Sequence, residues 1–239
     1  MTDGRFPDAV RRPGRAAASN APGRFERHDR VAEPDGWDIP EDLPVLRTLV
    51  TEERPRSLIN YVRSPDLPFD RTINPYRGCE HGCIYCFARP THAYLGLSPG
   101  LDFETRLIAR PDAPQVLARE LRARRYRVAP LAIGTNTDPY QPVERDRGIT
   151  RACLQVLQEF RHPVAVVTKG ALIERDIDIL SDMARQGLAR VGISVTTLES
   201  GLSRRMEPRA PQPARRIETI RRLVAAGIPV RIMASPMVP

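Results

Sequence analysis

An α/β fold built on a parallel sheet is the fold class that the sequence predicts. Short apolar runs rich in branched residues, such as 131–134 and 164–167, recur along the chain. Each run is followed by a segment with a helical period of apolar residues, and this alternation is typical of βαβ units with parallel strands. A doubly wound sheet and part of a (β/α) barrel both fit the pattern, and periodicity does not separate them.

The first predicted strand, residues 71–76, leads directly into a loop that contains three cysteines. Residues 91–100 are predicted as a loop or a short helix, and residues 103–109 as an accessory strand. A helix is predicted over 111–125, because its apolar residues recur at helical spacing. The arginines in and after this helix are interpreted as a solvated face: Arg119, Arg122, Arg124, Arg125 and Arg127.

Four further strands are predicted, at 131–134, 164–167, 190–195 and 230–234. Helices connect them. In the helix that begins near Ile149, an apolar stripe runs through Cys153 and Leu157, so Cys153 is predicted to be a buried thiol in the core. Gly187 and Gly227 mark the ends of the next two helices.

Residues 1–56 are predicted to form a largely disordered tail, and residues 57–239 the core domain. The tail is rich in Arg, Pro, Ala, Gly and Asp and shows no sustained helical or alternating period. Its basic first part and acidic second part fit a solvated leader or an arm that contacts nucleic acid. Trp37 and the segment 43–50 are candidates to dock on the domain. Removal of roughly the first 50 residues is expected to leave the site intact.

Three of the four cysteines, Cys79, Cys83 and Cys86, fall in one short loop with C-x3-C-x2-C spacing. Gly78 and Gly82 allow this loop to curl. Cysteine thiolates are the usual ligands of iron–sulfur clusters, which commonly take four of them. Three thiolates on a four-iron cluster leave one iron open, and an open metal position can bind a substrate or a cofactor.

This spacing, with Tyr85 before the last cysteine, resembles the signature of the radical S-adenosylmethionine superfamily. The longer string NPYRGCEHGCIYCFAR resembles the spore photoproduct lyase-like branch of that superfamily. The resemblance runs from about Arg71 to Pro239 and implies an open, partial (β/α)6 radical-SAM barrel. Because the chain stops just after the fifth predicted strand, the barrel is expected to be truncated there.

The resemblance also implies the cofactors and the reaction. In this superfamily, the open iron of a [4Fe–4S] cluster chelates the amino and carboxylate groups of S-adenosylmethionine. The cluster, reduced by an external electron donor of the flavodoxin or ferredoxin type, cleaves the sulfonium to give methionine and a 5'-deoxyadenosyl radical. That radical abstracts hydrogen from a substrate.

The sequence leaves the substrate open, with nucleic acid as one candidate. The net charge of +8 fits an anionic partner, but it fits a protein from an arginine-rich proteome equally well. Photoproduct lyases carry a cysteine hydrogen donor just after the second strand, whereas this chain has the stretch 134–137, Gly-Thr-Asn-Thr. Thymine-dimer repair is therefore not expected of this chain.

Reactive groups of parallel barrels lie at the carboxyl ends of the strands, where several polar residues are expected to meet. The predicted cofactor-binding residues are Tyr85, Thr137, Asp138, Lys169 and Ser194. By resemblance to the family's motifs, Thr137 and Ser194 give polar contacts and Tyr85 lies near the adenine. Lys169, the only lysine in the chain, resembles the lysine that meets the methionine carboxylate, a role that arginine does not simply replace. Secondary candidates are Arg204, Arg205, Glu207, Arg215 and Arg216.

The alternative interpretation is a zinc-stabilised nucleic-acid-binding module without catalysis. His81 or His92 could complete a closed site of three cysteines and one histidine. Zinc motifs more often pair their ligands as C-x2-C, which favours the cluster. The sequence shows no apolar run of membrane-spanning length and no opening signal segment, so the expected location is a reducing cytoplasm without membrane association.

Overall fold

A computed structural model of the 239-residue chain describes residues 14–26 and 46–237. Trp37 and residues 43–45 of the segment 43–50, which the sequence suggested as docking on the domain, lie outside the described residues. The strands are β1 (Leu49–Glu52), β2 (Asn60–Tyr61), β3 (Arg71–Ile73), β4 (Tyr76–Arg77), β5 (Arg106–Ala109), β6 (Leu131–Ile133), β7 (Val164–Thr168), β8 (Ala189–Ser194) and β9 (Val230–Met233). The helices are η1 (Arg89–Leu95), α1 (Leu101–Thr105), α2 (Ala113–Leu121), α3 (Glu144–Arg147), α4 (Ile149–Glu159), η2 (Ala171–Asp176), α5 (Ile177–Arg185), α6 (Ser200–Met206) and α7 (Pro213–Ala225).

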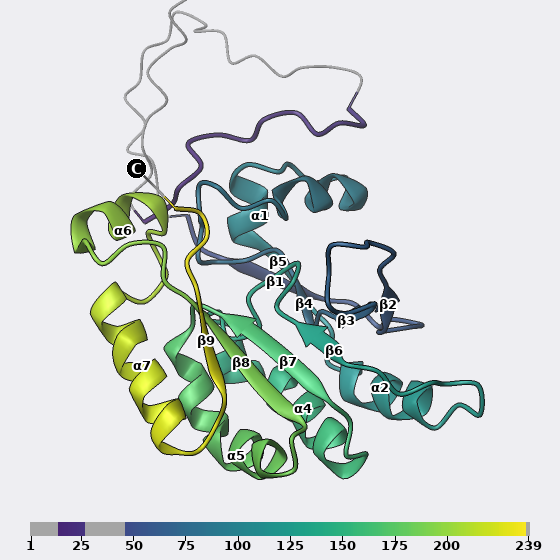
Figure 1. Ribbon diagram of the computed structural model, residues 1–239. Coiled ribbons are helices and arrows are strands. Elements are labelled where there is room, and N and C mark those ends of the chain that lie inside the picture. The colour runs from purple at the N-terminus through teal and green to yellow at the C-terminus, as the bar shows by residue number, and fades with distance from the viewer. Residues whose placement is uncertain (1–13, 27–45, 238–239) are drawn as a thin grey trace, which may run out of the picture.

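The main sheet has the order β2-β3-β6-β7-β8-β9. Strands β3, β6, β7, β8 and β9 pair in parallel, and β2 is antiparallel to β3. The parallel strands end on the same side of the molecule, where α1 and α6 also lie (Figure 1). The predicted α/β fold with a partial barrel is confirmed, because each parallel strand after β3 is reached through a helical connection.

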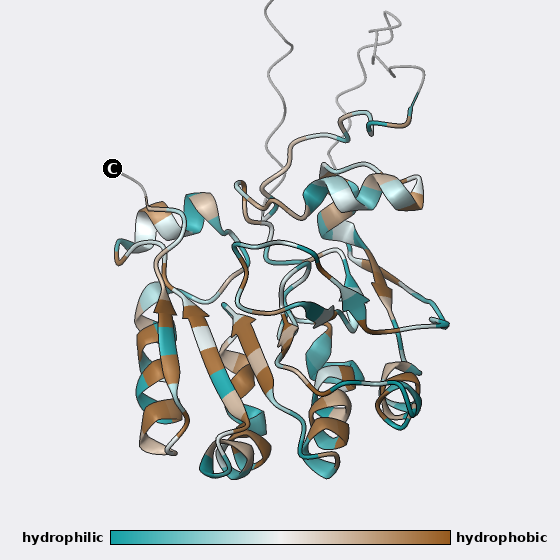
Figure 2. Cartoon of the chain, turned by 45° about the vertical axis from the view of Figure 1, so that its right-hand side comes forward, coloured by the Kyte–Doolittle hydropathy of each residue, from teal (hydrophilic) through white to brown (hydrophobic). Residues whose placement is uncertain are grey.

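Apolar packing between this sheet and its helices explains why the elements form where they do. The strands carry mostly apolar residues (Figure 2). In β7, Val164 and Val166 are buried and alternate with less buried neighbours, as a strand period of two requires. Helix α4 buries Cys153, Leu154 and Leu157 against the sheet, so the predicted core position of Cys153 is confirmed.

The segment 103–109, predicted as a strand throughout, begins as helix α1 and becomes β5 only at Arg106. Distant residues explain the difference. The carbonyl of Ser19 accepts a hydrogen bond from Leu101 N at 3.2 Å, and Asn20 Oδ1 accepts one from Asp102 N at 2.9 Å. These bonds satisfy backbone donors that the first turn of a helix leaves unpaired. Local sequence carries no sign of them.

Strand β5 lies in a second, three-stranded sheet of order β1-β5-β4. Strand β1 pairs in parallel with β5, with Leu49 opposite Arg106 and Glu52 opposite Ala109. Together with the contacts of residues 14–26, this pairing holds the described part of residues 1–56 against α1 and β5. These residues pack on the domain, because backbone and side-chain hydrogen bonds replace the apolar periodicity that they lack. Residues 1–13 and 27–45 lie outside the described residues.

Candidate functional site

The cysteine loop follows β4 at the carboxyl end of the main sheet, and its two glycines adopt positive φ angles of 77° at Gly78 and 65° at Gly82. A Cβ at Gly78 would lie 2.8 Å from Leu107 Cδ2 and 2.9 Å from the carbonyl oxygen of Phe103. Any other residue at this position would therefore be strained and would clash. The amide of Cys79 donates to that same carbonyl of Phe103 at 2.9 Å, which fixes the start of the loop.

Gln141, a fully buried residue beyond β6, holds the loop from the other side. Its Oε1 accepts a hydrogen bond from Glu80 N at 2.9 Å, and its Nε2 donates to Gly78 O at 3.2 Å. Thr137 Oγ1 also donates to Gly78 O, at 2.5 Å. The hydroxyl of Thr137 thus bonds the loop backbone. Sequence reasoning missed Gln141, because a glutamine between two turn segments gives no local signal of a partner 61 residues away.

A pocket of about 100 Å3 opens between the cysteine loop and the ends of β6, β7 and β8. It brings together eight residues that the sequence singles out: Cys79, Cys83, Cys86, His81, Thr137, Asp138, Lys169 and Ser194. Tyr85 is not among the residues that line it. Cys79 and Cys83 are buried, and Cys86 is half-buried at the pocket.

Asp138 joins the loop to two strand ends. Its Oδ2 accepts from Lys169 N at 2.8 Å and lies 3.2 Å from His81 Nδ1, and its Oδ1 accepts from Thr168 Oγ1 at 2.5 Å. Burial alone would raise the pKa of Asp138, but His81 and the hydrogen-bond donors outweigh burial and lower the pKa below its usual range. Asp138 is therefore an ionised anchor of the pocket wall.

Lys169 projects along the pocket wall towards a second buried group, the Glu207 cluster, which consists of Tyr85, Thr196, Glu207 and Arg216. Lys169 Nζ lies 4.0 Å from Glu207 Oε1 and 5.6 Å from the centre of the Tyr85 ring. The distance to the carboxylate exceeds that of a hydrogen bond, so the ammonium retains donors for another acceptor in the pocket.

Glu207 is fully buried, and Arg216 is 1% exposed. Arg216 Nη2 and the hydroxyl of Tyr85 both donate to the carboxylate of Glu207, and Thr196 Oγ1 donates to it at 3.3 Å. Arg216 also donates to the carbonyl of Ser194 at 3.0 Å, which ties the cluster to the end of β8. Burial, followed by the nearby Cys83 and Glu207, raises the pKa of Tyr85.

The other secondary candidates lie away from the pocket. Arg204 and Arg205 are exposed on α6, and Arg215 pairs with Glu174 beside η2. Glu207 and Arg216 are therefore the two of these five candidates that lie in the Glu207 cluster. Arg209, in the same stretch 204–216, also reaches the cysteine loop, because its Nη2 donates to Glu80 Oε1 at 3.1 Å. The backbone repeats this proximity, because Ile84 N donates to Met206 O at 3.0 Å.

The donor set fits an iron–sulfur cluster. Three thiols from one loop face one pocket, and thiolates are the ligands that such clusters require. Burial raises the pKa of the Cys83 thiol to about 12, so the positive charge of a metal is needed to hold it as a thiolate. The histidines weighed as zinc ligands contact other groups: His81 Nδ1 faces Asp138, and His92 Nε2 lies 2.9 Å from the carbonyl oxygen of Arg106.

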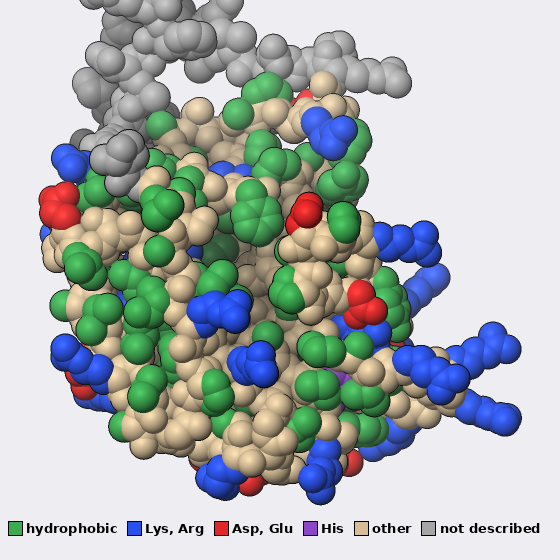
Figure 3. Space-filling view, viewed as in Figure 1, with side chains coloured by type: hydrophobic (Ala, Val, Ile, Leu, Met, Phe, Trp, Pro, Cys, Tyr) green, Lys and Arg blue, Asp and Glu red, His purple; other side chains and the backbone are tan. Residues whose placement is uncertain are grey.

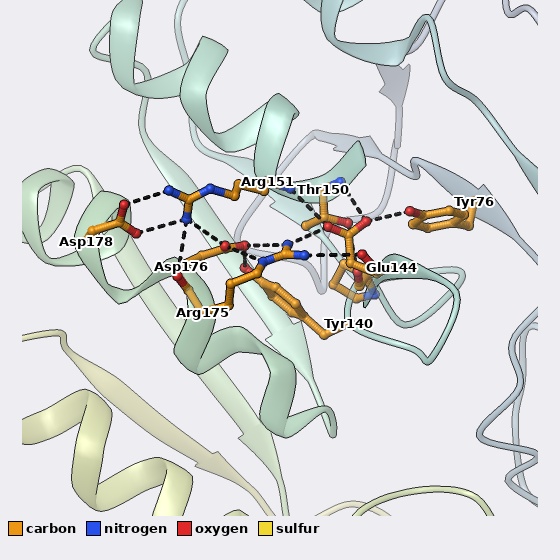
Figure 4. A network of polar contacts seen from close by, with 9 residues as sticks. Tyr76, Tyr140, Glu144, Thr150, Arg151, Arg175, Asp176 and Asp178 are labelled. Carbon is orange, nitrogen blue, oxygen red and sulfur yellow. Dashed lines mark hydrogen bonds and ion pairs between the residues drawn. The ribbon is translucent and has the colours of Figure 1, made fainter. Parts of the chain in front are cut away.

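A further buried polar group, separate from the Glu207 cluster and here called the closed network, lies around the start of α4 (Figure 4). Glu144 and Asp176 are both fully buried and share Arg175, whose Nη2 donates to Glu144 at 2.6 Å and whose Nε donates to Asp176 at 2.8 Å. The remaining bonds to the two carboxylates come from these residues: Tyr76, Tyr140, Thr150 and Arg151. None of the closed network lines the pocket beside the cysteines.

Comparison with known proteins assigns this arrangement to a family. The profile of the Radical SAM superfamily matches residues 73–239, and the chain belongs to this superfamily. The uncharacterized protein Rv2578c of Mycobacterium tuberculosis is 38% identical over 185 residues, which cover 77% of this chain and 54% of the relative. The uncharacterized protein MJ0683 of Methanocaldococcus jannaschii is 25% identical over 182 residues, which cover 76% of this chain and 64% of that protein.

Among solved structures, spore photoproduct lyase has a similar fold. Its complex with dinucleoside spore photoproduct superposes with a TM-score of 0.59 at 15% identity, covering 79% of this chain and 52% of that chain. A mutant of this lyase with bound AdoMet superposes with a TM-score of 0.58 at 15% identity, covering 78% of this chain and 50% of that chain. The expected likeness to this branch is thus confirmed in the fold. The chain spans about half the length of the mycobacterial relative and of the lyase chain.

Within residues 14–26 and 46–237, the structure contains no candidate membrane-spanning helix.

Proposed function

We propose that this chain is a radical S-adenosylmethionine enzyme that holds a [4Fe–4S] cluster on Cys79, Cys83 and Cys86. The observation that carries the proposal is the shared pocket, in which the cysteine loop and Lys169 line one cavity at the carboxyl ends of β6, β7 and β8. When bound and reduced, the cluster supplies the electron that cleaves the sulfonium of S-adenosylmethionine. Membership of the superfamily supports this general reaction.

The chain's own residues have distinct tasks in this proposal. Lys169 binds the methionine carboxylate through donors that Glu207 leaves free, because their separation is 4.0 Å. Ser194 supplies a polar contact from the end of β8. Thr137 and Asp138 act indirectly: they fix the cysteine loop and the backbone of Lys169 and so set the shape of the pocket. Tyr85, proposed from the family resemblance to lie near the adenine, directs its hydroxyl at Glu207.

Anaerobic reconstitution tests the proposal. The expected product is a brown protein with broad absorption near about 400 nm and about four irons per chain, the usual properties of such a cluster. Addition of dithionite and S-adenosylmethionine is expected to yield 5'-deoxyadenosine and methionine. A colourless protein that binds one zinc per chain would instead support the zinc-stabilised module.

The proposed reductant is an external flavodoxin or ferredoxin, and the proposed substrate class is nucleic acid. Phe87 supports the substrate proposal, because its ring lines the pocket and is 81% exposed. Exposed aromatic rings serve as stacking surfaces for unpaired bases. Arg204 and Arg205, exposed on α6 outside the pocket, are proposed to contact phosphates of the same strand. The most prominent basic side chains, however, project around the end of α2, away from the pocket (Figure 3).

Binding of single-stranded oligonucleotides to the reconstituted protein tests the substrate class. Phe87→Ala is expected to weaken binding by about 1 to 3 kcal/mol, the value of one base–aromatic stack. Arg124→Ala, in the basic group beyond α2, is the matched control. Unchanged affinity in Phe87→Ala together with weaker binding in Arg124→Ala would place the nucleic acid on the α2 side and remove it as the substrate of this pocket.

A further inference from the structure

The segment 14–26, here called the N-terminal strap, packs along α1, which lies beside the cysteine loop. Its Arg15 is only 7% exposed although it lies in a stretch without apolar periodicity. Arg15 Nη1 donates to the carbonyl of Glu104 at 2.8 Å, and Nη2 donates to Leu46 O and Thr48 Oγ1, both at 2.9 Å. A buried guanidinium with three fixed acceptors is an organised contact, because burying this charge unpaired would be costly.

One chain of hydrogen bonds runs from the strap to Cys83. The amides of Ala16 and Ala17 donate to the carboxylate of Glu104 at 3.1 and 3.0 Å. The same carboxylate accepts from Arg89 Nη2 at 2.6 Å, and Arg89 donates from Nε and Nη2 to the carbonyl of Cys83 at 3.1 and 3.0 Å. Glu104 also touches the loop directly, since a Cβ at Gly82 would lie 2.8 Å from its Oε2.

A second chain of hydrogen bonds reaches the loop between Cys79 and Cys83. Thr48 Oγ1, which accepts from Arg15, donates to Glu80 Oε1 at 2.5 Å. Glu80 is 5% exposed, and its Oε1 also accepts a hydrogen bond from Arg209 Nη2 at 3.1 Å. Arg15 is the common origin of both chains, because it binds the backbone of Glu104 on one side and Thr48 on the other.

We propose that the N-terminal strap positions the cysteine loop and that Arg15 is its main positioning residue. This inference rests on the proposed function, since it assigns the strap a role in holding the cluster. It reverses the expectation that roughly the first 50 residues are dispensable for the site. Groups beyond the ligands orient them, and their loss commonly weakens metal binding by about 10- to 100-fold.

The test uses the full chain, reconstituted anaerobically, and follows loss of the visible absorption after addition of an iron chelator. Arg15→Ala is expected to lose iron at least about 10-fold faster than the unchanged protein. Arg24→Ala, on the same strap but exposed and stacked on the Phe25 ring at 5.3 Å, is the matched control and is expected to change nothing. Arg15→Lys is expected to restore part of the retention, because an ammonium supplies donors in a different geometry.

Two further readings separate positioning from general stability. The electron paramagnetic resonance spectrum of the reduced cluster is expected to change in Arg15→Ala and to stay unchanged in Arg24→Ala, because cluster properties depend on hydrogen bonding and exposure. Thr48→Val keeps the side-chain shape but removes the hydroxyl, and it is expected to speed iron loss by about threefold. Thr48→Val provides the test of the strap if Arg15→Ala does not fold.

The outcomes distinguish the role of the strap from the proposed function of the chain. Iron loss and spectra in Arg15→Ala and Thr48→Val that match Arg24→Ala would overturn the role of the strap while leaving the cluster in place. Failure of the unchanged protein to take up iron would overturn the proposed function itself, and the strap role with it.

Discussion

Two buried carboxylate–arginine groups in this fold have similar chemistry but different surroundings. In the closed network, Arg175 bridges Glu144 and Asp176, and each carboxylate oxygen receives donors from neighbouring turns. In the Glu207 cluster, Arg216 donates to one carboxylate oxygen. The other oxygen accepts from Tyr85 and lies 4.0 Å from Lys169 Nζ, on the wall of the pocket.

The difference between the two groups shows how a buried polar group at a binding site can be distinguished from one that only stabilises the fold. Burial and ion pairing are common to both, so neither property identifies function. Only the Glu207 cluster adjoins a cavity through a cation that lacks a hydrogen-bonded carboxylate among the described residues. The closed network is expected to contribute stability alone, whereas the Glu207 cluster also shapes a binding site.

The largest expected effect lies outside both groups, at the cysteine loop. Cys83→Ala, like Cys79→Ala or Cys86→Ala, is expected to abolish stable iron binding, because each removes one of three thiolate ligands. Cys153→Ala is the matched control, since this thiol lies on α4 and is buried in the core. Iron analysis after reconstitution measures both, and equal loss of iron in Cys153→Ala would refute the ligand assignment.

Asp176→Ala probes the closed network. It removes the buried carboxylate that Arg175 and Arg151 share, leaves Arg175 paired with Glu144 alone, and is expected to lower the free energy of unfolding by about 3 to 5 kcal/mol. Urea unfolding of the iron-free protein gives this value. Affinity for S-adenosylmethionine in the folded, reconstituted variant is expected to be unchanged. A tenfold loss of affinity would show that the closed network also supports the binding site.

Lys169→Ala tests the pocket side of the comparison. Loss of the ammonium is expected to weaken S-adenosylmethionine binding by about 30-fold or more, since truncating one partner of a desolvated charged contact costs about 2 to 5 kcal/mol. Iron content is expected to be retained. Titration of the reconstituted variant with S-adenosylmethionine decides the matter: an unchanged affinity would mean that Lys169 serves only Glu207 and the fold.

Tyr85→Phe is expected to give the smallest change. The hydroxyl donates to Glu207 and does not line the pocket, so its removal should cost about 1 kcal/mol of unfolding free energy. The expected change in S-adenosylmethionine affinity is less than about threefold. The same titration and unfolding measurements apply, and a larger loss of affinity would show that the hydroxyl contacts the cofactor.

The local sequence determined the elements and the ligand loop of this protein. Apolar runs and helical periods located β6 to β9 and helices α2, α4, α5 and α7, because side chains that must be buried repeat with the period of the element. The cysteine spacing, with glycines at 78 and 82, marked the loop, because those glycines adopt positive φ. The order of strands and helices placed Lys169 and Ser194 at one end of the sheet.

Only the tertiary structure decided what holds that loop. Gln141 bonds the loop backbone directly, Glu104 acts through Arg89, and Arg15 acts through Glu104 and Thr48. A lone polar residue has no periodic pattern, and its hydrogen-bond partner is set by the packing of distant elements. The same reason applies to Glu207, whose place beside Lys169 depends on how α6 and α7 return to the end of β7. The local sequence therefore determined where the three cysteines lie, and the packing of distant elements determined which residues support their loop.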